Sequence, residues 1–144
     1  METKKTSAEP FVIERTYQAT GEKVWQAITD KVKMKQWYFD VSDFKPEVGF
    51  EFQFTGENEG IIYRHLCKVI AVETGKKLSY SWTYDGFPGY SVVTFELFSE
   101  GDKTRVKLTH EGLETFPDMK DFKRENFIGG WTQIIGKNLK EFVE

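Results

Sequence analysis

The two histidines of this chain, His65 and His110, are the side chains whose ordinary pKa suits them to move a proton near neutral pH. In a pocket, either one would serve as a general acid or base. Neither has a Cys, Asp or Glu beside it at the spacing of a metal site, so the sequence predicts no metal ligands. The simpler interpretation of both is a buried, neutral imidazole whose nitrogens are hydrogen-bonded.

The other groups with reactive potential point away from catalysis. Cys67 is the single cysteine, which excludes an internal disulfide, and its apolar neighbours predict a buried, unreactive thiol. The sequence contains no Gly-rich phosphate loop, no Ser or Cys nucleophile beside a patterned base, and no paired carboxylates directed to one covered face. We therefore expect no catalytic residue and no cofactor. An enzyme of the cyclase or aromatase kind, using His65 and His110, remains an alternative.

The C-terminal stretch, residues 126–144, is the longest helix-patterned segment and must position much of any site. Its apolar side chains recur at three- and four-residue steps: Phe127, Ile128, Trp131, Ile135, Leu139 and Phe142. It also contains Gly129, Gly130 and Gly136, each of which costs about 1 kcal/mol in a helix interior relative to alanine. Two interpretations account for that cost: the helix packs closely onto a sheet, or the glycines leave room for a ligand between helix and sheet.

The elements before this helix follow from the hydrophobic period. The pattern predicts a first strand over 11–19, a helix over 21–30 capped by Thr20, and a second helical turn through Gln36. Five further strands are expected at 50–54, 61–72, 78–84, 91–98 and 104–111. Gly-containing links separate them, which is typical of antiparallel hairpins. The predicted architecture is α+β: a curved antiparallel sheet of about six strands that grips the long C-terminal helix, with two short helices after the first strand.

Length and composition bound the possible partners. The 144 residues suit one domain, residues 10–144, behind a flexible leader at 1–9. Aromatic residues make up 16% of the chain, which predicts a large aromatic interior. The net charge of -3 without a basic stripe argues against nucleic acid. We find no signal-peptide pattern and no run of about 18 apolar residues, so we expect no membrane insertion, and the lone cysteine suits the cytoplasm.

Side-chain alternation predicts which residues face the helix. On the strand over 61–72, Arg64 and Lys68 should face water. The covered set of that strand is then Ile61, Tyr63, His65, Cys67, Val69 and Ala71. The same test directs inward Phe50, Phe52, Phe54, Leu78, Tyr80, Trp82, Tyr84, Val93, Phe95, Leu97, Val106, Leu108 and His110. Arg15 also falls on the inward face, and the sequence leaves open whether it reaches out to water or pairs with a carboxylate.

Several short motifs, taken in order, carry a resemblance to a known family. They are Val24-Trp25, Thr29-Asp30, Trp37, Lys68-Val69-Ile70-Ala71-Val72, Leu78-Ser79-Tyr80-Ser81-Trp82, Leu108-Thr109-His110-Glu111-Gly112 and Gly130-Trp131. Together, over roughly 11–143, they resemble the activator of heat-shock protein 90 ATPase-like branch of the START-related (SRPBCC) superfamily. The resemblance implies a helix-grip fold with a cavity between sheet and C-terminal helix. Across the superfamily this cavity binds lipids, polyketides, hormones and other apolar molecules, and some members use it for catalysis.

The aromatic wall and the helix glycines lead to a hypothesis of function. A small, mainly apolar ligand, which is aromatic, polyketide-like or lipid-like, binds between sheet and helix. The expected binding residues are Trp37, Tyr63, His65, Trp82, Tyr84, Phe95, His110, Phe127, Trp131 and Ile135. Residues 37–39 and the loop 86–90 are expected to border the entrance. For Trp82 and Trp131 the alternative is that they only fill the core.

A second hypothesis comes from the resemblance alone. It implies a protein-interaction module that binds the heat-shock protein 90 chaperone and stimulates its ATPase. The two hypotheses differ in what they expect of the surface. A ligand-binding domain hides its aromatic side chains, whereas an interaction module exposes an apolar patch.

Overall fold

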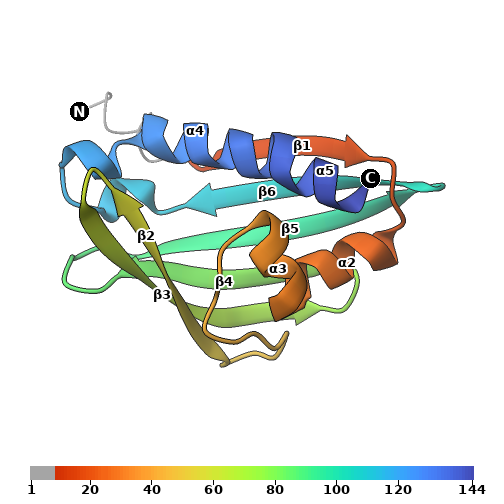
Figure 1. Ribbon diagram of the computed structural model, residues 1–144, viewed down its shortest axis with the longest axis horizontal. Coiled ribbons are helices and arrows are strands. Elements are labelled where there is room, and N and C mark those ends of the chain that lie inside the picture. The colour runs from red at the N-terminus through yellow and green to blue at the C-terminus, as the bar shows by residue number, and fades with distance from the viewer. Residues whose placement is uncertain (1–8) are drawn as a thin grey trace.

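Residues 9–144, which the computed structural model describes, form a six-stranded antiparallel sheet that curves around the C-terminal helix (Figure 1). The leader expected at 1–9 lies outside the described residues except for its last position. The strands are β1 (Phe11–Tyr17), β2 (Glu51–Asn58), β3 (Ile61–Glu73), β4 (Lys77–Tyr84), β5 (Ser91–Glu100) and β6 (Lys103–Glu111). Their spatial order is β1-β6-β5-β4-β3-β2, and each neighbouring pair is antiparallel, so the predicted meander is confirmed.

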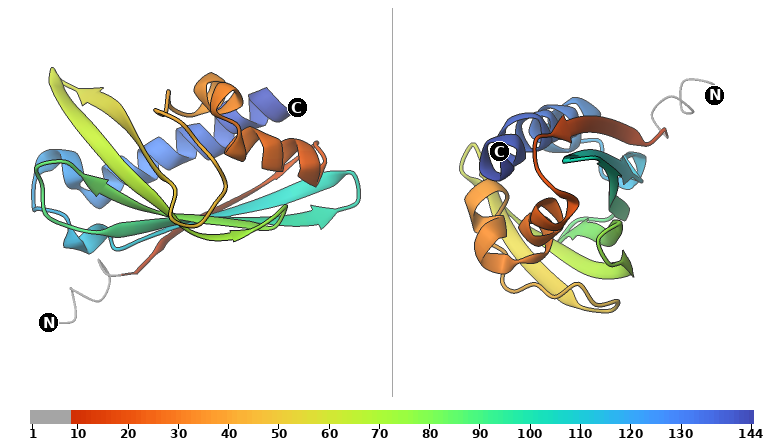
Figure 2. Two further views of the ribbon diagram at one scale, coloured as in Figure 1. Left: turned by 90° about the horizontal axis from the view of Figure 1, so that it is seen from below. Right: turned by 90° about the vertical axis from the view of Figure 1, so that its right-hand side faces the viewer.

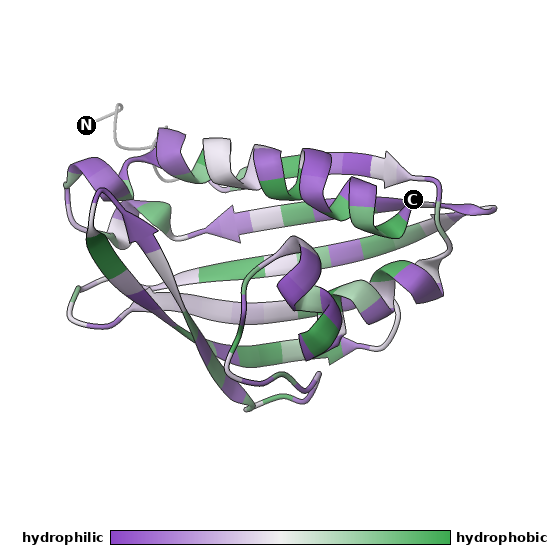
Figure 3. Ribbon diagram, viewed as in Figure 1, coloured by the Kyte–Doolittle hydropathy of each residue, from purple (hydrophilic) through white to green (hydrophobic). Residues whose placement is uncertain are grey.

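The helices lie on the concave face of this sheet (Figure 2). Two short ones, α2 (Gly21–Thr29) and α3 (Lys31–Trp37), follow β1 as predicted. Two single 3₁₀ turns, η1 (Leu113–Thr115) and η2 (Lys120–Phe122), connect β6 to the C-terminal helix. The side of that helix that faces solvent is mainly hydrophilic, and the side that faces the sheet is mainly apolar (Figure 3). No helix within residues 9–144 combines the length and apolar composition needed to cross a bilayer.

Polar caps begin both short helices, and a tryptophan joins them. The Thr20 hydroxyl accepts a hydrogen bond from the Lys23 backbone N–H, which confirms the predicted cap, and Asp30 caps α3 in the same way. The buried indole of Trp37 donates its N–H to the Ala27 carbonyl at 2.8 Å. Trp37 therefore fastens α3 to α2, and its expected position at a cavity entrance is wrong.

A β-bulge in β3 shifts the predicted alternation. The pairing of β3 with β4 slips between Val69 and Ala71, which leaves Ile70 as the extra residue. Beyond the bulge, Val72 pairs with the inward-facing Leu78 and packs on the core, so the inward orientation predicted for Ala71 is wrong. Ile61, also predicted to be covered, is 50% exposed because it lies next to the hairpin turn.

The C-terminal helix is continuous from Arg124 to Val143, but its middle turn is a π-helix. It consists of α4 (Arg124–Gln133), the π segment η3 (Ile134–Asn138) and α5 (Leu139–Val143). Its buried side chains recur at every fourth position: Phe127, Trp131, Ile135, Leu139 and Val143. Such a row drifts by about 40° per step on an α-helix with 3.6 residues per turn. The wider π turn absorbs part of this drift and keeps the row on the sheet.

Ile128 was assigned to the same apolar face, and that assignment is wrong. Its side chain is 37% exposed. It follows Phe127 directly, so it is rotated by about 100° from the buried row.

The helix glycines are not explained by close packing onto the sheet. A Cβ atom at Gly129 or Gly130 would meet no atom within 4 Å, and one at Gly136 would meet the Arg15 guanidinium only at 3.7 Å. Arg15 thus reaches past the helix, and its exposed side chain donates to the Glu14 carbonyl at 2.7 Å. Of the two open interpretations of Arg15, the structure favours the one in which it reaches out to water.

Candidate ligand-binding cavity

The tip of the β2–β3 hairpin lies near the segment that leads into α4 (Figure 1). Two adjoining hollows are lined by residues of this hairpin, η2 and α4. We call them together the end cavity. The larger lobe has a volume of about 370 Å³ and is lined by Phe39, Gly56, Glu57, Asn58, Tyr63, His65, Tyr84, Asp121, Phe122 and Asn126. The smaller lobe has a volume of about 180 Å³ and is lined by Phe39, Trp82, Tyr84, Asp121, Asn126, Phe127, Gly130, Trp131 and Ile134. The lobes share four residues: Phe39, Tyr84, Asp121 and Asn126.

Stacked aromatic rings form the wall of the end cavity on the side of the sheet. Phe39 and His65 line the larger lobe, and both stack on Phe54 behind them, with ring centroids 4.3 and 4.4 Å from that of Phe54 and planes within 15° of parallel. Tyr84 packs against Phe122 of η2 at 4.8 Å. Rings that contact one another on several sides lose little freedom when a further ring is added, so such a wall suits an aromatic ligand.

Tyr84 and Trp82, two residues apart on β4, are joined through their polar atoms. The indole N–H of Trp82 donates to the Tyr84 hydroxyl at 2.9 Å. Both side chains are buried and point to the covered face of the sheet, as their spacing predicts. Burial raises the pKa of Tyr84, so its hydroxyl stays protonated at neutral pH.

An acidic side chain of η2 also lines the larger lobe. Asp121, on η2, accepts hydrogen bonds from the Tyr63 hydroxyl and from the Asn58 amide, the latter at 2.7 Å. Next to it, Lys120 pairs with Glu59 on the hairpin turn at 3.1 Å. These contacts hold η2 against the hairpin and thereby shape the lobe.

His65 lines the larger lobe as a neutral ring. Burial among aromatic side chains lowers its pKa to about 4, and hydrogen bonds to the backbone of Phe54 and Tyr63 offset this only in part. One contact, from Nδ1 to the Tyr63 carbonyl oxygen, measures 3.2 Å. At neutral pH His65 is therefore part of the uncharged wall.

His110 lies deeper, outside both lobes, and each of its nitrogens has a partner. Nδ1 accepts the indole N–H of Trp131 at 2.9 Å, and Nε2 contacts the Ser91 hydroxyl at 2.9 Å. That hydroxyl donates onward to the Trp82 carbonyl at 2.7 Å. Burial lowers the pKa of His110 to about 3. Its role in the structure is to orient Trp131.

Six of the ten residues expected to bind a ligand do line the end cavity: Tyr63, His65, Trp82, Tyr84, Phe127 and Trp131. The other four, Trp37, Phe95, His110 and Ile135, are packed in the interior and line neither lobe. Phe39 borders the cavity as expected of its segment. The loop 86–90 does not, because Phe87 packs behind Phe122 at 5.2 Å and Tyr90 lies on the outer face. These placements concern position; ligand binding by any of the six stays a prediction.

Several lining residues escaped the sequence analysis. They are Gly56, Glu57, Asn58, Asp121, Phe122, Asn126 and Ile134. Asp121 and Phe122 come from the connection between β6 and α4, which has neither a strand nor a helix period. The only signal in the sequence was the adjacent Asp121 and Phe122, and two residues without a period do not predict a position in the fold.

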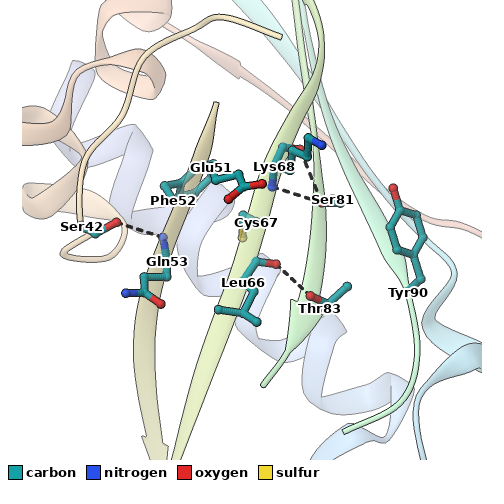
Figure 4. Close-up of a pocket in the computed structure, with 10 residues that line it drawn as sticks. All are labelled: Ser42, Glu51, Phe52, Gln53, Leu66, Cys67, Lys68, Ser81, Thr83 and Tyr90. Carbon is teal, nitrogen blue, oxygen red and sulfur yellow. Dashed lines mark hydrogen bonds between the residues drawn. The ribbon is translucent and has the colours of Figure 1, made fainter. Parts of the chain in front are cut away.

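A separate groove of about 550 Å³ runs over the outer face of β2, β3 and β4 (Figure 4). Three of its polar side chains already pair with the local backbone: Ser42 with Gln53, Ser81 with Lys68, and Thr83 with Leu66. Glu51 and Lys68 are cross-strand neighbours at its edge. The groove is larger than either lobe, but it has no aromatic wall apart from the exposed Tyr90 and atoms of Phe52.

Within residues 9–144, no three His, Cys, Asp or Glu side chains gather as a metal site. Burial raises the pKa of the Cys67 thiol, so this residue stays protonated. The end cavity has an aromatic wall, two tyrosine hydroxyl groups and two acidic side chains.

Comparison with known proteins places this architecture in a family. A family model described as Activator of Hsp90 ATPase homolog 1-like protein matches residues 18–144. The chain belongs to this family. The match covers the whole sheet except β1, together with all the helices. No curated protein is similar to the chain by sequence.

Solved structures share the fold of this Activator of Hsp90 ATPase homolog 1-like chain. Protein MLL2253 from Mesorhizobium loti is 29% identical with a TM-score of 0.72, and the alignment covers 93% of this chain and 96% of that one. Protein CV1439 from Chromobacterium violaceum is 23% identical with a TM-score of 0.78, covering 94% and 96%. DynU16, a protein in the dynemicin biosynthetic locus, is 19% identical with a TM-score of 0.75, covering 92% and 46%. The predicted helix-grip fold and the resemblance to the family are confirmed.

Proposed function

We propose that this protein binds a small, mainly apolar, aromatic or polyketide-like ligand in the end cavity. The observation that carries the proposal is a preformed hollow of about 370 Å³ with stacked aromatic rings on its wall. Small-molecule sites commonly have volumes of about 300–1,000 Å³ and are lined by aromatic side chains with a few polar groups. The end cavity has this composition.

The distribution of aromatic side chains also suits a ligand-binding domain. The chain has 13 Phe, 6 Tyr and 4 Trp, and of those only Tyr90 and Phe98 are exposed. A ligand-binding domain was expected to hide its aromatic rings. The apolar surface expected of an interaction module has a counterpart in the exposed Ile62, Leu66 and Ile70 of β3. The buried set includes the rings that line the end cavity.

Structural neighbours are compatible with the same class of ligand. DynU16 has the same fold and is a protein of the dynemicin biosynthetic locus. At 19% identity this likeness concerns the fold alone. It supports the proposal only in that a protein of the same fold belongs to a biosynthetic locus.

Tryptophan fluorescence tests the proposal directly, because two of the four tryptophans line the smaller lobe. Titration with flavonoid-like, polyketide-like and fatty-acid compounds should give saturable quenching by one class. Trp82→Phe and Trp131→Phe should change the amplitude, whereas Trp25→Phe should not, because Trp25 lies on α2 outside both lobes. If no compound in the panel perturbs the fluorescence, ligand binding in the end cavity is refuted.

The family's description supports a second candidate, an interaction with heat-shock protein 90 that stimulates its ATPase. The exposed Leu66 and Tyr90 beside the outer groove are the surface that such a contact would use. Chaperone ATPase assays with the purified protein test this candidate. An unchanged ATPase rate, together with no co-precipitation, would remove it.

Catalysis of the cyclase or aromatase kind has less support from the cavity. A general base works best with a pKa near the operating pH, and the histidine of the cavity wall has its pKa lowered to about 4.

We also infer a cytoplasmic location, because a buried, protonated Cys67 thiol suits a reducing compartment.

A further inference from the structure

The hydroxyl group of Tyr84 has a proton that the fold does not use. An indole N–H can only donate, so in the bond between Trp82 and Tyr84 the tyrosine oxygen is the acceptor. Within residues 9–144 this is the only hydrogen bond of that oxygen. Tyr84 is 8% exposed, so its O–H is a buried donor without a protein acceptor.

Tyr63, on the same wall, provides the contrast. Its hydroxyl donates to the Asp121 carboxylate, so its proton is already engaged. Tyr63 and Tyr84 both line the larger lobe, and their rings are 6.1 Å apart. The two hydroxyl groups therefore differ in what they can offer a ligand: Tyr84 can donate, and Tyr63 cannot without breaking a bond to a carboxylate.

The side chain of Tyr84 lines the end cavity. Tyr84 lines both lobes, so a ligand in either one comes close to it. Phe122, Phe116 and His65 hold its ring, with centroids at 4.8, 5.2 and 4.7 Å. A donor held in this way is preorganised for an acceptor atom of the ligand.

The charges of the cavity point to an uncharged ligand. Among the residues that line the two lobes, the charged ones are Glu57 and Asp121, which are both acidic, and neither Lys nor Arg is present. In a partly desolvated site, like charges repel more strongly than in water. A fatty-acid carboxylate or a phosphate would therefore meet two negative groups and no cation.

We propose that the end cavity binds an uncharged aromatic ligand and holds a carbonyl oxygen of that ligand with the Tyr84 hydroxyl. The proposal rests on the ligand-binding function proposed above and narrows its chemistry. Among the candidate ligands of the end cavity, it keeps aromatic ketones and polyketide-like compounds and excludes fatty acids. A carbonyl oxygen suits Tyr84 because it accepts hydrogen bonds near the plane of its own group, which lets the attached ring lie flat along the aromatic wall.

Three two-ring probes separate the elements of this proposal. 1-Tetralone has the aromatic ring and the carbonyl, tetralin has the rings without the oxygen, and 1-naphthoate has a carboxylate. Calorimetry at pH 7 should rank their affinities in that order, with tetralone about three- to tenfold tighter than tetralin, as one net hydrogen bond provides. Naphthoate should bind most weakly of the three.

Two tyrosine variants form the matched control. Tyr84→Phe should weaken tetralone binding by about three- to tenfold and leave tetralin within twofold. Tyr63→Phe removes a hydroxyl from the same lobe whose proton is already used, so it should leave the preference for tetralone over tetralin unchanged. The infrared carbonyl band of bound tetralone gives a readout that does not depend on variant stability. It should shift to lower frequency in the wild-type complex and not in Tyr84→Phe.

Each outcome has one meaning. If tetralin binds as tightly as tetralone, or if Tyr84→Phe leaves the carbonyl band shifted, the role of Tyr84 is refuted while the cavity stands. If naphthoate binds best, the charge argument is refuted. If none of the three probes binds, both the carbonyl proposal and the ligand-binding function fall.

Discussion

Trp131 and His110 share a hydrogen bond of 2.9 Å in which the indole N–H donates to Nδ1 of the imidazole. Because an indole can only donate, Nδ1 must be unprotonated and the ring must be neutral with its proton on Nε2. Nε2–H then donates to the Ser91 hydroxyl, whose own proton goes to the Trp82 carbonyl. The two tryptophans of the smaller lobe are thus connected through His110, which needs to be neutral for the connection to exist.

The first prediction concerns acid stability. Burial lowers the pKa of His110 in the folded protein from 6.5 to about 3, so as the pH falls below about 6.5 the unfolded chain takes up a proton that the folded chain refuses. The stabilising contribution is therefore fully present above pH 6.5 and is lost progressively toward pH 3. The expected slope is up to about 1.4 kcal/mol of unfolding free energy per pH unit for one histidine.

Urea unfolding of the wild type and of His110→Gln between pH 7.5 and pH 4 measures this slope. A glutamine amide can accept from Trp131 and donate to Ser91, but it does not titrate. The difference between the two slopes isolates His110, because the carboxylates titrate in both proteins. Equal slopes would show that His110 is not held neutral by the fold.

The second prediction concerns the bond between Trp82 and Tyr84. Tyr84→Phe should destabilise the protein by about 1–3 kcal/mol, because it leaves the buried indole N–H of Trp82 without an acceptor. In a Trp82→Phe background the same substitution should cost less, since that donor is gone. Chemical unfolding of the two single variants and the double variant gives the coupling energy. Additive effects would mean that the bond contributes nothing.

Side-chain alternation could predict the wall of the cavity, because every second residue of a strand faces the same side. Tyr63, His65, Trp82 and Tyr84 were placed correctly by this rule alone. The rule failed at Ala71, because the bulge at Ile70 adds one residue to the strand. No Gly or Pro at this point of the sequence indicates a bulge. A bulge is decided by how neighbouring strands pair, which local sequence does not contain.

The location of the cavity could not be predicted in the same way. Phe95 and His110 face inward as expected, yet neighbouring rings fill the space around them, so that they line neither lobe. Whether an inward-facing ring meets a ligand or another ring depends on the packing of the whole interior. Asp121 was missed because the path of the chain between β6 and α4 has no period from which its position follows.

The third prediction concerns the contact between η2 and the β2–β3 hairpin. Asp121→Ala removes the acceptor for both Tyr63 and Asn58 and should loosen the hairpin tip. Amide exchange of residues 57–63 should become about tenfold faster, as expected for the loss of about 1.4 kcal/mol of local stability. Amides at the centre of β5 serve as the internal reference, and if exchange at the tip is unchanged, Asp121 does not hold the hairpin.

The last prediction uses two adjacent glycines of α4 that differ in one respect. A Cβ atom at Gly129 or at Gly130 would meet no atom within 4 Å, so alanine at either position should raise the stability of the helix by about 1 kcal/mol. Only Gly130 lines the smaller lobe, where its missing side chain leaves space beside Trp131. Gly130→Ala should therefore weaken ligand binding while Gly129→Ala leaves it unchanged, although thermal unfolding should show both variants stabilised alike. Parallel titrations of the two variants with 1-tetralone measure the difference, and equal affinities would show that ligands do not enter the smaller lobe. A loss of affinity in Gly130→Ala alone would explain the helix glycine as room kept for a ligand at a cost in stability.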